Sequence, residues 1–490
     1  VRFDLNVTLA DGDTGTTIAA TFFDGLNFSG WDGLSFGALT LSGAAAAVAS
    51  NGSAVAFATI DGAQNLSINA GATGTISLTG AVGATTPPGT ITITQSNGTT
   101  FSGNVSAAAL AVSDTQAGQT VSVLGNLVLS GGNLFASGPT AYHVSLTGAV
   151  NSISGTGTFT NTGNLTLGDA DTDSFTFTGG LTATLTNTNW IRGTIATGGG
   201  AGQNLEFDTF TLAGVTTLNA GANGNLVFSA PVTVPDFAAA TDLSVTAALV
   251  SAAGTTLTVQ DGARADILNS SSITLNTLSL PGAASVADLG SSGFTIGTLS
   301  NLGTLRLTGL QATHNFTTFD TNSGITEYYG TGAGSLVFTA GFAGGTYWDL
   351  RIASSGAGVH TLQNPVTVNN DLHIAAGGVL DVSGANHLLT VNGNWRNDEG
   401  DAGFVARSGT VDFNKTAGVI EIRGNNTWYV FQVLTAAPGL EVHFENDLAG
   451  AGIQSRQRIA IGGIFRIRGT LPANSIRLDR LTDTGIDPGN

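Results

Sequence analysis

The sequence predicts an all-β fold in which short strands wind into stacked coils, a β-solenoid. Three observations support this prediction. No window keeps apolar residues at helical spacing for three turns, whereas short segments alternate apolar and polar residues between clusters of Gly, Asn, Asp and Pro. A five-residue motif, called here the recurring phrase, also repeats along the chain. It consists of Gly, a small polar residue, an apolar residue, one often polar residue and a second apolar residue. It begins at Gly74, Gly125, Gly163, Gly224, Gly303, Gly334 and Gly409.

Each phrase predicts a short strand that the chain enters through a turn. Coils of about 20 to 25 residues would give about 20 coils and an elongated rod on the order of 100 Å, at a strand spacing of about 4.8 Å. A row of β-sandwiches would need linkers about every 100 residues, and none is visible. We expect an N-terminal cap with the first coils, a Gly/Thr/Ser/Asn-rich solenoid, a solenoid with a duplicated repeat, and an edge strand with a tail, at residues 1–60, 61–330, 331–470 and 471–490.

Both ends of the chain carry strand-like segments, and an open solenoid end is an unpaired sheet edge. These terminal strands either cap their own coil or pair with another copy. Pairing between copies would be heterologous and would build filaments. The candidate interface residues are Val1, Phe3, Leu5, Val7 and Leu9 near the start and Ile476, Arg477, Leu478, Asp479 and Arg480 near the end.

Composition restricts the partners and the compartment. The 490 residues carry a formal net charge of −18, which disfavours nucleic acid and anionic membranes. No apolar stretch is long enough to span a bilayer. Cys and Met are both absent, and the chain begins at Val1. We therefore expect a processed, secreted protein of the cell surface or extracellular space.

Three aspartates, Asp169, Asp171 and Asp173, stand at alternate positions. In an extended segment they would share one face, and in a loop they could surround Ca²⁺. The EF-hand template does not fit, because Ser174 replaces its turn glycine and Gly180 its bidentate glutamate. Calcium binding by another loop geometry and a solvated acidic turn are the two interpretations, and no cofactor is required.

A charged cluster beside Trp395 raises an enzymatic alternative. Paired carboxylates can serve as acid and base in glycoside cleavage, and an Arg beside acid-bound Ca²⁺ can abstract a proton in a lyase. The tryptophan could then stack on a sugar ring. Since the same segment belongs to a recurring repeat, where an aromatic residue ordinarily packs, we predict that the protein is not an enzyme. The cluster comprises His387, Arg396, Asp398, Glu399 and Asp401.

A longer duplication lies near the C-terminus, where Gly334–Leu372 aligns with Gly409–Ile453 when a six-residue gap is allowed. Thr346-Tyr-Trp-Asp-Leu in the first copy then faces Thr427-Trp-Tyr-Val-Phe in the second. At these residues the chain resembles the degenerate repeats of bacterial secreted β-helix proteins: autotransporter passengers, haemagglutinin-like adhesins, and fibre or surface-layer subunits. The resemblance covers about residues 320–470. It implies a right-handed parallel β-helix, extracellular placement and a structural or adhesive role, and it carries over no catalytic residue.

The sequence thus predicts a non-enzymatic extracellular structural protein. Copies of it would join head to tail through their terminal strands into a filament, sheath or layer on a bacterial surface. One alternative is a monomeric adhesin or glycan-binding stalk, whose partners would be glycans or neighbouring cells. A polysaccharide lyase or hydrolase is the less favoured alternative.

Overall fold

A computed structural model describes residues 2–3, 7–9, 17–22, 27–30, 33–138, 140–268, 272–354, 356, 358–424, 426–434, 441–445 and 459–468. These residues form the predicted all-β parallel solenoid, with about 18 turns. The one helical element among them is the short 3₁₀-helix η1 (Gly400–Ala402). The chain divides into two compact units, unit 1 (Val1–Gly303) and unit 2 (Thr304–Asn490).

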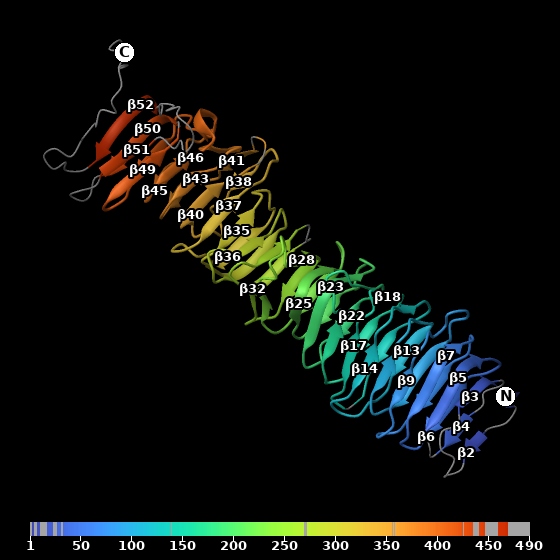
Figure 1. Ribbon diagram of the computed structural model, residues 1–490. Coiled ribbons are helices and arrows are strands. Elements are labelled where there is room, and N and C mark those ends of the chain that lie inside the picture. Colours follow the sequence, from blue (N-terminus) through green and yellow to red (C-terminus); the bar gives the residue numbers. More distant parts are fainter. Residues whose placement is uncertain are drawn as a thin grey trace, which may run out of the picture. The chain divides into compact units, whose positions relative to one another are not determined.

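Unit 1 consists of parallel strands stacked side by side from one coil to the next (Figure 1). One stack contains β1 (Arg2–Phe3), β3 (Thr17–Phe22), β5 (Leu34–Leu41), β7 (Val55–Asp61), β9 (Ile76–Leu78), β11 (Thr99–Phe101), β12 (Val105–Ala107), β14 (Thr120–Val123), β15 (Leu127–Leu129), β17 (His143–Leu146), β18 (Val150–Ile153), β20 (Leu165–Leu167), β21 (Ser174–Phe177), β23 (Asn189–Thr197), β25 (Thr211–Asn219), β28 (Leu243–Thr246), β31 (Arg264–Ile267) and β33 (Val286–Asp288). The long β23 pairs with both β20 and β21, so two narrower stacks merge there.

The second stack of unit 1 forms another side of the same coils. It contains β2 (Val7–Leu9), β4 (Asn27–Gly30), β6 (Ala46–Ser50), β8 (Leu66–Asn69), β10 (Thr90–Gln95), β13 (Ala109–Val112), β16 (Leu134–Ala136), β19 (Gly157–Phe159), β22 (Leu181–Ala183), β24 (Leu205–Phe207), β26 (Asn225–Phe228), β27 (Val232–Val234), β29 (Ala248–Ser251), β30 (Thr256–Val259), β32 (Ile273–Leu280) and β34 (Phe294–Asn301). A coil such as β11, β12 and β13 therefore has three sides, each hydrogen-bonded to the next coil.

Unit 2 has three separate stacks. The first, called here the charged stack, contains β35 (Thr304–Leu307), β37 (Ile325–Tyr328), β40 (Asp349–Ile352), β43 (Leu372–Ile374), β46 (Trp395–Asn397), β49 (Val419–Arg423) and β51 (Glu441–Glu445). The second contains β38 (Leu336–Val337), β41 (Gly358–Leu362), β44 (Gly378–Asp381) and β47 (Phe404–Val405). The third contains β39 (Thr346–Tyr347), β42 (Val366–Val368), β45 (Leu389–Val391), β48 (Thr410–Phe413), β50 (Asn426–Leu434) and β52 (Ile459–Arg468), and β36 (His314–Thr318) follows β35.

Coil length follows from the strand register and varies along the chain. Ile91 pairs with Leu110 across a short coil, whereas Trp395 pairs with Ile422 across a long one. Most neighbouring coils have lengths between these two, a slightly wider spread than the expected coil of about 20 to 25 residues. The spread explains why the recurring phrase does not return at a fixed interval.

The core is a set of apolar ladders inside the coils. Val121, Val144 and Leu165 pair in register and are 1%, 3% and 0% exposed. Their sequence neighbours point outward because successive side chains of a strand alternate between its two faces. Burying each such side chain contributes about 1.5 to 3 kcal/mol, repeated at every coil.

Close contact with neighbouring atoms explains the glycine that opens most copies of the recurring phrase, although a Cβ on Gly334 would meet no atom within 4 Å. Each phrase leads into a strand, as expected, and the one at Gly163 leads into β20. A Cβ added to Gly163 would lie 1.9 Å from the backbone oxygen of Tyr142 in the preceding coil. A side chain at this corner would therefore force the two coils apart.

Replacing Gly163 with Ala should lower the free energy of unfolding by about 1 to 3 kcal/mol, because the added methyl group overpacks a backbone contact. Gly384→Ala is the matched control, since a Cβ there meets no atom within 4 Å and its φ is not positive. Urea unfolding followed by circular dichroism compares the two. Equal stability of both variants would show that the corner has room for a side chain.

Candidate functional site

An outward row of ionisable side chains, called here the charged row, crosses the charged stack of unit 2. Each residue occupies the register position facing the previous one, from β35 to β49. Neighbouring strands in a sheet lie about 4.8 Å apart, so the row repeats at that interval. Its members are Arg306, Glu327, Arg351, His373, Arg396 and Arg423.

Strand alternation places the row on the surface. Leu350, Leu372 and Trp395 precede Arg351, His373 and Arg396 in their strands, and each is 0% exposed. Once these apolar side chains enter the core, the following residue of each strand must face solvent. The sequence alone shows each alternation, but the register between coils is what aligns the charges.

Glu327 binds two arginines of the row. Its carboxylate accepts Arg306 Nε at 2.7 Å and lies 3.1 Å from Arg351 Nη1, with only 8% of the side chain exposed. The Arg306 guanidinium also lies 4.3 Å from the centre of the Tyr329 ring, a cation–π distance. This end of the row is therefore fixed by shared ion pairs.

Asp398 has the same role for two further residues of the row, His373 and Arg396. Its Oδ1 accepts Arg396 Nε at 2.8 Å, and its Oδ2 lies 2.8 Å from His373 Nε2. Partial burial favours a raised pKa of Asp398, but the hydrogen bonds and charges of Arg396 and His373 outweigh it and lower that pKa. The carboxylate is thus held in its charged form.

A second outward row lies two residues earlier in the same strands and loops. Asp349 Oδ1 accepts the backbone N–H of Asp371, whose Oδ1 accepts that of Asn394 at the same distance, 2.8 Å. Asn394 Oδ1 in turn accepts the backbone N–H of Glu421 at 3.0 Å. Burial raises the pKa of Asp349, although hydrogen bonds from Asp371 and Asn370 oppose this shift. The side chains of Asp349, Asp371 and Asn394, called here the acidic row, therefore each bind the backbone of the next coil.

Between the two rows runs a shallow groove with a volume of about 230 Å³. Guanidinium donors form one wall, and carboxylate and amide oxygens form the other. This arrangement suits a ligand with both acceptors and hydroxyl donors. The polar lining residues are Asp349, Arg351, Asp371, His373, Asn394 and Arg396.

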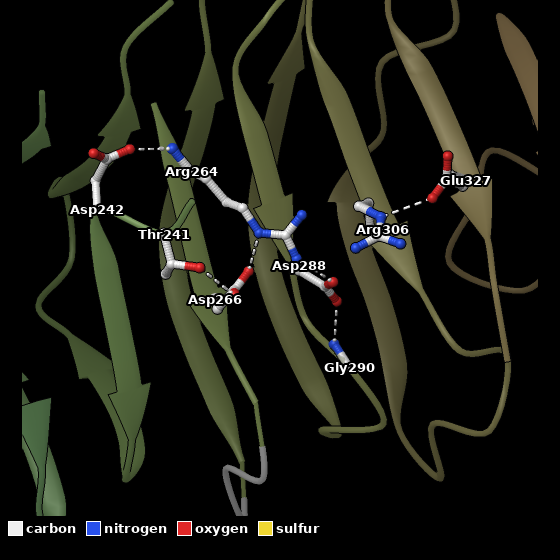
Figure 2. A network of polar contacts seen from close by, with 8 residues as sticks. All are labelled: Thr241, Asp242, Arg264, Asp266, Asp288, Gly290, Arg306 and Glu327. Carbon is white, nitrogen blue, oxygen red and sulfur yellow. Dashed lines mark hydrogen bonds and ion pairs between the residues drawn. The ribbon is translucent and has the colours of Figure 1, made fainter. Parts of the chain in front are cut away.

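Unit 1 contains a related network around Arg264 (Figure 2). Arg264 Nε donates to Asp266 at 2.7 Å, and its Nη2 lies 3.1 Å from Asp288, whose side chain is 2% exposed. The backbone N–H of Arg264 donates to Asp242, which is fully buried. Asp288 also accepts the backbone N–H of Gly290. The arginine therefore stabilises one carboxylate of its own strand, Asp266 in β31, and one of the neighbouring strand, Asp288 in β33.

Replacing Arg264 with Met should lower the free energy of unfolding by about 2 kcal/mol, since hydrogen bonds to charged groups contribute about 1.5 to 3 kcal/mol. Arg264→Lys keeps the charge but loses the planar fork, so we expect a smaller loss. Urea midpoints for the two variants test this order. A methionine variant as stable as the parent would show that the network contributes no net stability.

The three aspartates predicted as a calcium alternative do not converge. Asp173 is buried, and its Oδ2 accepts the backbone N–H groups of Asp169 and Ala170. Asp171 pairs with Arg192 at 2.8 Å, and the hydrogen bond from Arg192 lowers the pKa of Asp171. Within the described residues, no group of three or more His, Asp or Glu side chains is placed to hold a metal ion. Calcium binding at these aspartates stays a prediction.

The cluster considered for catalysis is only partly assembled. Trp395 is fully buried, so the expectation that it could stack on a sugar is wrong, and the packing interpretation is confirmed. Arg396 and Asp398 meet, whereas Glu399 accepts the backbone N–H of Gly377. The sequence missed His373 as the partner of Asp398, because a whole coil of the chain separates the two. Alternation within β43 places His373 on the outer face of its strand, but it does not show which residue of the next coil lies beside it.

The predicted interface residues are only partly described. Phe3 lies in β1, and Val7 and Leu9 lie in β2. The remaining candidates, Val1, Leu5 and residues 476–480, lie outside the described residues. Among the described strands, β1 and β2 pair only with β3 and β4, while β51 and β52 pair only with β49 and β50.

The described residues contain no helix that is long and apolar enough to cross a membrane. Comparisons of the chain with protein-family models, curated proteins and solved structures give no match. Its parallel solenoid architecture is therefore established by its own strand register, and its function must be argued from the geometry of its edges and surfaces.

Proposed function

We propose that the protein is a non-enzymatic extracellular structural subunit that assembles head to tail with copies of itself. The product would be a filament, sheath or layer on a bacterial surface. The observation that carries the proposal is the pairing of the outermost described strands. Among the described strands, β1, β2, β51 and β52 each have a neighbour on one side only.

Backbone chemistry supplies the driving force for such assembly. A parallel strand with one neighbour presents N–H and C=O groups that another strand can pair. Stacking β51 and β52 of one copy against β1 and β2 of the next would continue two ladders with the same parallel direction. Because the contact is heterologous, addition of further copies would repeat it without closure.

The wider chemistry of the chain supports a durable, exposed scaffold. Each coil satisfies the backbone of its neighbours, and no Cys or Met is present to be oxidised. The net charge of −18 keeps lateral surfaces mutually repulsive, which favours growth at coil ends over irregular aggregation. The resemblance of residues 320–470 to secreted β-helix proteins supports the extracellular placement.

Electron microscopy of the full chain tests the proposal, with and without a calcium chelator. We expect regular fibres or sheets for the parent chain. Thr8→Pro should abolish them, because proline within the edge strand β2 removes a backbone donor and obstructs pairing. Thr8→Val keeps that donor and is the matched control. Loss of the parent fibres on chelation would implicate bound Ca²⁺ in assembly.

Separate particles at every protein concentration, with the parent chain folded by circular dichroism, would contradict assembly and favour the monomeric adhesin. Fibres from Thr8→Pro as regular as those of Thr8→Val would contradict the role of β2 and place the contact elsewhere.

A further inference from the structure

The charged row stands out against the charge of the whole chain. Acidic residues outnumber basic ones by 33 to 15. Yet four arginines and a histidine occupy one aligned row of six outward positions. Stability alone does not require this alignment, because surface ion pairs contribute only about 0 to 1 kcal/mol each.

Each carboxylate that pairs with the charged row serves two of its residues, which leaves guanidinium donors facing solvent. Glu327 serves Arg306 and Arg351, and Asp398 serves His373 and Arg396. The side chains of Arg351 and Arg396 remain 41% and 48% exposed. Arg351 Nε is enclosed and has no hydrogen-bond partner within the described residues. Because this Nε is enclosed, only the exposed part of the Arg351 guanidinium can donate to a ligand in the groove.

The opposite wall of the groove presents acceptors. Asp349 and Asp371 each commit Oδ1 to the backbone of the next coil, which fixes the orientation of the carboxylate. Hydroxyl groups of a ligand can donate to oxygen atoms on this wall, while acidic groups of the same ligand face the arginines. A free carboxylate ion or a phosphate would use only the cationic wall.

Both walls repeat at every coil, at the strand spacing of about 4.8 Å. Arg351, His373 and Arg396 follow one another on β40, β43 and β46. A repeated array of donors is complementary to a repeated array of acceptors, so a linear polymer can bind along several coils. Multivalent contacts of this kind give useful affinity from individually weak sites.

We propose that this groove binds a linear polysaccharide that carries carboxylate groups, with its chain running along the charged row. Carboxylates of the sugar units bind Arg351, His373 and Arg396, and sugar hydroxyls bind the acidic row. This inference concerns a lateral surface and goes beyond self-assembly through the edge strands. The net negative charge of the protein repels polyanions elsewhere, so binding requires this local array.

Calorimetric titration with polygalacturonate tests the proposal, and its fully methyl-esterified form is the matched ligand with the charges removed. We expect the parent chain to bind the acid form only. Arg396→Gln should weaken binding about tenfold or more, because it removes a charged hydrogen-bond donor from the array. Arg351→Gln with Arg396→Gln should abolish binding.

Arg192→Gln is the control variant, because Arg192 and Asp171 form an exposed ion pair of 2.8 Å in unit 1, the same length as the Arg396–Asp398 pair. We expect its affinity to equal that of the parent, and thermal unfolding confirms that each variant is folded. Equal binding of the esterified polymer, equal weakening by Arg192→Gln, or no binding by the parent would overturn the proposal. Repeating the titration on Thr8→Pro separates the result from assembly.

Discussion

Replacing Trp395 with Ala is expected to lower the free energy of unfolding of the solenoid by about 3 to 5 kcal/mol, the range for a large aromatic residue in a packed core. Trp395 is fully buried, and its ring centre lies 4.7 Å from that of Trp428 and 5.0 Å from that of Phe404. Its indole N–H donates to Asn426 Oδ1 at 2.9 Å. The substitution removes both the ring contacts and this buried hydrogen bond.

Trp395→Phe is the matched control, because it keeps an aromatic ring and loses only the indole donor and part of the volume. Asn426 Oδ1 still accepts Asn397 Nδ2 at 3.0 Å, so no buried acceptor is left unpaired. We expect this variant to lose clearly less stability than Trp395→Ala. Urea unfolding followed by circular dichroism measures both. Similar small losses for the two variants would place the ring outside the packed core.

Acidification should destabilise the protein through His360, by about 3 kcal/mol between pH 6.5 and pH 4. The residue is fully buried, and its Nδ1 lies 3.2 Å from Ser354 Oγ. Burial lowers the pKa of His360 from 6.5 to about 4, outweighing backbone hydrogen bonds at Thr308 and Gly358. The unfolded chain therefore takes up a proton at higher pH than the folded chain does, and stability falls as pH drops through this interval.

His360→Leu removes the titrating group and replaces it with an apolar side chain of similar size. Its free energy of unfolding should depend less on pH between 6.5 and 4 than that of the parent, whatever its stability at pH 7. His387→Leu is the control, because His387 is only half-buried, whereas His360 is fully buried. Urea midpoints across this pH range measure the slopes, and parallel slopes for parent and His360→Leu would refute the assignment.

The fold class could be predicted from the sequence alone. Period-two alternation and the glycine phrase are local signals, and they depend on backbone geometry that every coil shares. Gly163 illustrates this, because the close approach of the neighbouring coil leaves no room for a Cβ at that corner. The same alternation places His373 and Arg396 on the outer faces of β43 and β46.

Which outward residues contact one another, in contrast, is visible only in the folded protein. Coil length changes along the chain, from the short coil between Ile91 and Leu110 to the long one between Trp395 and Ile422. The residue that lies beside a given side chain in the next coil therefore cannot be found by counting a fixed number of residues along the sequence. His373 pairs with Asp398, a partner that the sequence did not indicate, and Trp395 faces inward. Alternation is a property of one strand and can be read locally, whereas register depends on how every intervening turn packs.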